Sequence, residues 1–270
     1  MMNKIEQVFD KLWQQYTEES PEALKIYNLF KENGEDNIVN DHVAFRTFDD
    51  PRVDVDTLGK FFIELGYEEK GDYHFPVKKL YAKHYEHKSD ATMPKVFISH
   101  LLTKEFSALV QEQAKACVDQ IATSELNSIG LLSSGVHWDL DYDVYQKLLA
   151  ESEYAAWMYV FGFRANHFTV FVNHLKTFKS VEEINQFLKA KGLTLNSSGG
   201  EIKGTPAELL EQSSTMANKV PVKFRQGTFE VLNSYYEFAR RYPDASGKLY
   251  TGFIAASADK IFESTNVGTK

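Results

Sequence analysis

NDHVAFRTF (residues 40–48) and RANHFTVFVNHL (residues 164–175) are the two stretches that decide the fold of this chain. Their alternation and their content of β-forming residues predict a strand in each. A histidine stands at the same place in both, His42 in the first stretch and His167 in the second. The two strands belong to an internal repeat if the elements predicted after them also follow the same order.

The order of elements after each strand is the same. A loop leads to a helical segment, LGKFFIELGYE in the first copy and INQFLKAKGLTL in the second, which ends at a glycine. Gly66 lies 24 residues after His42, and Gly192 lies 25 residues after His167. The chain is therefore predicted to contain two tandem copies of one module, with the two histidines in equivalent positions.

The whole pattern predicts an α+β fold, in which two tandem βαβββ modules form a half-open mixed sheet around a metal site, with added N-terminal and central helices. The expected divisions are N-terminal helices (1–39), a first module (40–102), a helical insertion (103–163), a second module (164–242) and a C-terminal segment near the pocket (243–270). Within the second module we expect a capped helix over 180–192, a strand over 192–196 and an inserted helix from Thr205-Pro206 to about Ala217. Strands are then expected around 222–232 and 234–242, and one aromatic helix is expected over 144–163.

Composition excludes several classes of protein. Hydrophobic residues make up 43% of the 270 residues, which allows a large core and argues against disorder. A net charge of −8 and a pI near 5.5 argue against nucleic acid or an anionic membrane as partner. The single cysteine, Cys117, fits a reducing compartment, and no signal peptide or membrane-spanning run is visible. A cytoplasmic protein is expected.

The paired histidines indicate a metal site, because a core strand would otherwise prefer Val, Ile or Phe there. Two histidines and one carboxylate can bind a divalent metal and leave positions open for substrate and oxygen. Glu237, in the aromatic strand YYEF, is the favoured third ligand because an unpaired buried carboxylate is costly. Glu230, on the preceding strand, is the competitor. Without a metal, the histidines would be hydrogen-bonded core residues.

These motifs resemble a known family. The double βαβββ repeat with His, His and Glu is similar to the vicinal oxygen chelate superfamily. NDHVAFRTF, NHFTVFVNHL, YYEFARRYP and GKLYTGFIAASADKIFESTN resemble, more closely, the family of 2-oxoadipate dioxygenase/decarboxylase, in a branch with a shorter chain. The resemblance covers most of the sequence.

The resemblance implies an Fe(II) enzyme that converts a 2-oxo acid and O2 into CO2 and a 2-hydroxy acid with one fewer carbon, as in lysine catabolism. It implies His42, His167 and Glu237 as metal ligands and Arg46 as the residue that holds the substrate carboxylate. An offset of four along a strand keeps Arg46 on the same face as His42. The alternative is an arginine paired with Asp49 or Asp50. Zn, Mn and Ni are the alternative metals.

Other functions remain open at this stage. A metal-dependent isomerase, lyase or hydrolase of the same superfamily would need no O2, and a non-catalytic relative would only bind a small ligand. Ser257 and Lys260 have the Ser-x-x-Lys spacing of some serine hydrolases, although Ser257 is rather expected to contact substrate near the mouth of the pocket. The sequence determines neither the substrate nor the oligomeric state.

Overall fold

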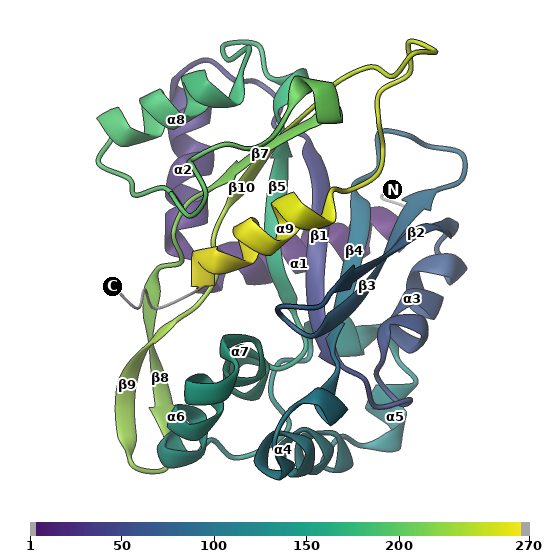
Figure 1. Cartoon of the computed structure of the whole chain (residues 1–270), viewed down its shortest axis with the longest axis vertical. Coiled ribbons are helices and arrows are strands. Elements are labelled where there is room, and N and C mark those ends of the chain that lie inside the picture. The colour runs from purple at the N-terminus through teal and green to yellow at the C-terminus, as the bar shows by residue number, and fades with distance from the viewer. Residues whose placement is uncertain (1–3, 266–270) are drawn as a thin grey trace.

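A curled sheet of eight strands forms the centre of the protein (Figure 1), whose computed structural model describes residues 4–265. The strands lie in the order β2-β3-β4-β1-β5-β10-β7-β6, and β8 pairs with β9 in a separate hairpin. The strands are β1 (Asn40–Phe48), β2 (Tyr67–Phe75), β3 (Leu80–His87), β4 (Lys95–Leu101), β5 (Ala165–Phe171), β6 (Lys203–Thr205), β7 (Leu210–Ser214), β8 (Lys219–Phe224), β9 (Gly227–Leu232) and β10 (Glu237–Arg241).

Helices surround this sheet. The α-helices are α1 (Lys4–Glu19), α2 (Pro21–Glu32), α3 (Val55–Glu64), α4 (Ala108–Asp119), α5 (Thr123–Leu126), α6 (Tyr142–Glu151), α7 (Glu153–Phe161), α8 (Val181–Ala190) and α9 (Ala255–Phe262). Short 3-10 turns are η1 (Thr103–Glu105), η2 (Ile129–Ser133), η3 (Val172–His174), η4 (Pro206–Glu208) and η5 (Glu263–Thr265).

The sheet consists of two copies of one βαβββ module. In the first, β1 pairs in parallel with β4, which pairs with β3 and then β2. In the second, β5 pairs in parallel with β10, which pairs with β7 and then β6. The antiparallel pair β1 and β5 joins the copies at the centre of the sheet. The predicted fold class, two βαβββ modules in one mixed sheet, is confirmed.

The prediction of an inserted helix over 205–217 was wrong, because these residues form a 3-10 turn and strand β7. The element inserted into the second module is the β8–β9 hairpin. Thr205 caps a single 3-10 turn, and Leu209 at a φ of +66° ends it. The next residues form β7, which fills the place of β3 in the first copy. The β8–β9 hairpin lies between β7 and β10 in the sequence and extends away from the main sheet, in which β7 and β10 pair directly (Figure 1).

Two smaller expectations also differ from the structure. Residues 192–196 form no strand but a single bridge between Leu195 and Thr215. The aromatic helix over 144–163 is two helices, because Ser152 has an extended backbone and its side chain accepts a hydrogen bond from the Ala155 amide as an N-cap. The predicted cap of α8 is present, since the Ser180 hydroxyl accepts from the Glu183 amide at 3.1 Å.

The two faces of the sheet are covered differently (Figure 1). α1, α3 and α8 pack on one face, whereas α9 from the end of the chain lies across the other. On the first face Trp13 packs edge-on against Phe168 at 5.1 Å and also contacts Tyr236. Each such large apolar side chain stabilises the fold by about 1.5–3 kcal/mol when fully buried. The polar residues of β1, β5 and β10 are thereby left to the face under α9.

Within residues 4–265, no helix combines the length and the apolar character needed to cross a membrane. The cytoplasmic location stays a prediction.

Candidate metal centre

The structure brings His42, His167 and Glu237 together on the face of the sheet under α9. Their nitrogen and oxygen atoms lie within 4.8 Å of one another. His167 Nε2 is 3.1 Å from one carboxylate oxygen of Glu237, and His42 Nε2 is 3.8 Å from the other. The exposed fractions of the three residues are 3%, 4% and 1%, so bulk water does not separate them.

The outer nitrogen of each histidine is held by its preceding residue. Asp41 Oδ1 accepts from His42 Nδ1 at 2.8 Å, and Asn166 Oδ1 accepts from His167 Nδ1 at 2.9 Å. A proton on Nδ1 leaves the lone pair of Nε2 facing the carboxylate in both cases. In the absence of a metal the Thr169 hydroxyl, 3.0 Å from His42 Nε2, can donate to one of these lone pairs. The three side chains could therefore hold a divalent metal.

The electrostatics of Glu237 agree with this arrangement. Burial alone raises the pKa of its carboxyl, but His42, His167 and a hydrogen bond from Gln212 outweigh that effect and hold the pKa below its usual value. Burial lowers the pKa of His167, which favours the neutral imidazole that binds metals. An anionic carboxylate beside a neutral imidazole is the donor set that a divalent metal requires.

The repeat also shows why the set has three protein ligands. Glu237 on β10 pairs with Thr169, two residues after His167. The matching residue in the first module is Phe97 on β4, which pairs with Ala44, two residues after His42. Phe97 lines the same cavity but offers no ligand atom. One side of the site is consequently free of protein ligands, and a substrate could bind a metal there.

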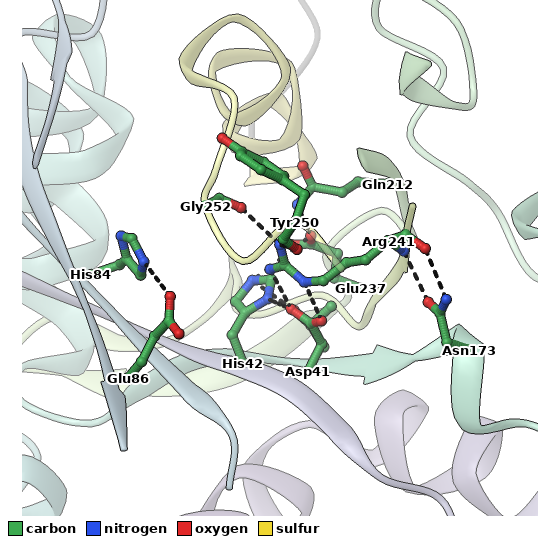
Figure 2. Close-up of polar contacts among 11 residues, drawn as sticks. Asp41, His42, His84, Glu86, Asn173, Gln212, Glu237, Arg241, Tyr250 and Gly252 are labelled. Carbon is green, nitrogen blue, oxygen red and sulfur yellow. Dashed lines mark hydrogen bonds and ion pairs between the residues drawn. The ribbon is translucent and has the colours of Figure 1, made fainter. Parts of the chain in front are cut away.

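A second layer of contacts ties His42 to the segment that follows β10 (Figure 2). Arg241 donates to both carboxylate oxygens of Asp41, at 2.6 and 2.8 Å. The same guanidinium donates to the carbonyls of Tyr250 and Gly252, at 3.1 and 2.8 Å. The carboxylate that orients His42 thus depends on the guanidinium that anchors this segment.

The anchored segment closes the cavity. Phe253 stands 4.9 Å from His42, ring centre to ring centre, and Tyr73 Oη accepts from the Phe253 amide at 3.1 Å. Ala258, Ile261 and Phe262 of α9 complete the roof of a small cavity over the three side chains. An apolar roof over a polar floor excludes water from the donor atoms.

Arg46 is buried on the same face of β1 as His42, two pleats along. It does not pair with Asp49 or Asp50, so that alternative was wrong: Asp49 accepts from Thr103 and Asp50 from Arg52. Arg46 instead contacts Glu153 at 3.4 Å and Thr265 at 3.2 Å. Its guanidinium also lies over the rings of Tyr154, Trp157 and Phe262.

The other candidates lie elsewhere. Glu230 is exposed on the β8–β9 hairpin, outside the main sheet, and is not part of the cluster. Ser257 is buried in α9 and faces Gly204, whereas its neighbour Ala258 lines the cavity. Its contact with substrate stays a prediction. Lys260 is exposed while Ser257 is buried, which does not favour a Ser–Lys dyad.

Sequence reasoning did not find Asp41, Gln212 and Tyr235. Asp41 directly precedes His42, and a carboxylate next to a proposed histidine ligand was a usable signal. Gln212 was hidden inside the incorrectly predicted helix. Tyr235 was visible only as an aromatic neighbour of Glu237, yet its ring stacks on His167 at 4.5 Å.

Both the sequence and the fold of this chain are similar to those of known proteins. The family model described as 2-oxoadipate dioxygenase/decarboxylase matches residues 4–248. The chain belongs to this family. A 2-oxoadipate dioxygenase/decarboxylase family member from Arabidopsis thaliana chloroplasts is 33% identical over 277 residues, which is 93% of this chain and 74% of the relative. The resemblance inferred from the sequence motifs is confirmed.

Solved structures of other proteins agree with this fold. Hydroxyglutarate synthase from Oryza sativa, crystallised with 2-oxoadipate, superposes with a TM-score of 0.89 at 31% identity, covering 97% of this chain and 91% of that one. A protein from Shewanella frigidimarina described as a candidate hydrolase superposes with a TM-score of 0.88 at 50% identity, covering 94% and 99%. The fold seen in this structure is therefore shared with these two proteins over almost the whole chain.

Proposed function

We propose that this protein is a metal-dependent dioxygenase/decarboxylase that converts a 2-oxo acid of the 2-oxoadipate type and O2 into a 2-hydroxy acid and CO2. The observation that carries the proposal is the buried cluster of His42, His167 and Glu237 in a chain of this family. The reaction is balanced, since both atoms of O2 enter the 2-hydroxy acid, one in its new carboxylate and one in its hydroxyl group, while CO2 leaves with the oxygens of the original carboxylate. We propose Fe(II) as the metal.

The protein's own residues have three tasks in this reaction. His42, His167 and Glu237 would hold the metal, which supplies the site where the 2-oxo acid and O2 meet. The ring of Phe97, where the first module could have offered a ligand, keeps room for a substrate that binds through two oxygens. Phe253 and α9 exclude water, and Arg46, which lies over the ring of Phe262, would hold the far carboxylate.

The direct test uses protein loaded anaerobically with Fe(II). A panel of 2-oxo acids is added with O2, and CO2 release and O2 uptake are followed together. We expect equal molar amounts of CO2 released and O2 consumed, with 2-oxoadipate among the best substrates. Turnover without O2 would instead support an isomerase, lyase or hydrolase that uses the metal as a Lewis acid.

Arg46→Lys gives a prediction for the substrate anchor. Lysine keeps the positive charge but loses the planar pair of donors that matches a carboxylate. We expect kcat/KM for 2-oxoadipate to fall about 100-fold, a loss typical of a buried charged contact, while metal content stays unchanged. Arg52→Lys is the control, because Arg52 also pairs with a carboxylate but lies half exposed beside Asp50. Equal activity of the two variants would remove Arg46 from the site.

A further inference from the structure

Tyr235 is a polar residue of the cavity that the proposed function does not yet use. It lies just before β10 and lines the cavity beside Glu237. Its ring stacks on His167, with 4.5 Å between ring centres and 28° between the planes. This stacking fixes the direction of the side chain, so the hydroxyl has a defined place.

The Tyr235 hydroxyl is buried and, among residues 4–265, has no hydrogen-bond partner. Arg46 Nε, a second buried donor, is likewise without a partner in that part of the chain. Both residues border Phe262: the Arg46 guanidinium lies over the Phe262 ring, and Phe262 lines the cavity together with Tyr235. A buried tyrosine hydroxyl normally finds a partner in a folded protein. Two neighbouring donors without acceptors therefore indicate an acceptor that arrives with a ligand.

The nature of that acceptor can be deduced from the donors. A guanidinium and a phenol both donate, and a carboxylate has up to four lone-pair sites to receive them. The contact between Arg46 and Glu153 is long, at 3.4 Å, and Glu153 already accepts from the Thr265 hydroxyl at 2.6 Å. Arg46 thus keeps donor capacity, at Nε among its nitrogens, next to Phe262, which lines the cavity. A metal held by His42, His167 and Glu237 would bind the 2-oxo end of a substrate. A substrate carboxylate near Arg46 would then be the one at the opposite end of the molecule.

Resting on the proposed function, we propose that the Tyr235 hydroxyl donates a hydrogen bond to the distal carboxylate of a dicarboxylic 2-oxo acid, which it shares with Arg46. Tyr235 then determines specificity. A 2-oxo acid of equal length without the second carboxylate would leave two buried donors unpaired, and such sites reject the analogue strongly. A dicarboxylic acid satisfies both donors at once.

The structure offers a matched pair of variants. Tyr235→Phe removes the hydroxyl and keeps the ring that stacks on His167. Tyr236→Phe is the control, because the Tyr236 hydroxyl is also buried without a partner among the described residues but lies on the opposite face of the sheet, against Trp13. The ligands are 2-oxoadipate and 2-oxohexanoate, which have six carbons each and differ in the second carboxylate. Binding to metal-loaded protein without O2 is measured by calorimetry, and kcat/KM is measured in air.

For Tyr235→Phe we expect Kd for 2-oxoadipate to rise about tenfold and Kd for 2-oxohexanoate to stay unchanged, as for the loss of one hydrogen bond to a charged group. Tyr236→Phe should match the wild-type protein for both acids. An equal loss for both acids in Tyr235→Phe would overturn the inference, because only the stacking on His167 would then matter. Identical affinities in the two variants would overturn it as well. Failure of the wild-type protein to bind either acid would overturn the proposed function, a result that is distinct from the other two.

Discussion

Replacing Glu237 with glutamine is expected to lower the affinity for Fe(II) by at least about 100-fold, since even residues behind a metal ligand contribute 10–100-fold. Glutamine keeps the size of the side chain but removes the negative charge between His42 and His167. Metal content after dialysis, measured by mass spectrometry, should fall from near one ion per chain to a trace. Turnover of 2-oxoadipate should fall with it.

The control is Glu230→Gln. Glu230 is exposed on the β8–β9 hairpin, so its variant should keep the metal and the activity of the wild-type protein. Circular dichroism of both variants separates loss of metal from loss of fold. Full metal content in Glu237→Gln would refute the assignment of the third ligand.

Asp41→Asn is expected to destabilise the protein by about 3–5 kcal/mol, the usual cost of leaving one charge of a buried pair without its partner. Asp41 and Arg241 are both buried, at 2% exposure each, and make two hydrogen bonds to each other. Asparagine can still accept from His42, so the effect reports on the lost charge. The free energy of unfolding in urea measures it for the metal-free protein, and metal affinity should fall about 10–100-fold.

Asp139→Asn is the matched control, because Asp139 also pairs with an arginine, Arg225, but both side chains are exposed. Little change in stability is expected there. A double-mutant cycle of Asp41→Asn with Arg241→Met isolates the energy of the pair. A variant Asp41→Asn as stable as Asp139→Asn would contradict a stabilising role for the buried pair.

The pH dependence of this contribution has a definite sign. Burial raises the pKa of Asp41, but Arg241 and the hydrogen bond from His42 outweigh burial and hold the pKa well below the ordinary 3.8. A carboxyl with a lowered pKa stabilises the fold fully above its unfolded pKa and loses this effect as the pH falls toward the folded pKa. The difference between the wild-type protein and Asp41→Asn should therefore be constant at neutral pH and shrink only below about pH 4.

The central parts of the fold could be predicted from the sequence, because the same order of strand, loop and helix occurs twice in the chain. His42 and His167 were found at equivalent positions, and the strands that carry them begin at or within one residue of the expected place. Glu237 was favoured over Glu230 by the cost of burying a carboxylate, and the structure places only Glu237 in the cluster.

The segment after Thr205 shows where local signals fail. Thr205 does cap a turn, since its hydroxyl accepts from the Glu208 amide. The turn does not continue as a helix, because the following residues gain more by pairing with β10, with Gln212 opposite Ala239. A capping signal describes only its own turn, whereas strand pairing depends on a partner far away in the sequence.

The supporting contacts of the site were out of reach for a related reason. Asp41 and Arg241 are separated by 200 residues, and no period in the sequence connects them. Tyr235 stacks on His167 and lines the cavity with Phe262, which Arg46 contacts, and these contacts arise only in the folded sheet. Sequence patterns identify residues of suitable chemistry, but only the folded structure shows which of them are in contact.

The antiparallel pairing of β1 with β5 at the centre of the sheet has a consequence for folding. Separated from the other, either module would expose this strand as an unpaired edge and half of the donor set, which favours aggregation over function. Neither half is thus an independent unit of stability, and the two should unfold together in one cooperative transition. A single event of folding would then create both the sheet and its metal-binding capacity, with no stage at which one exists without the other.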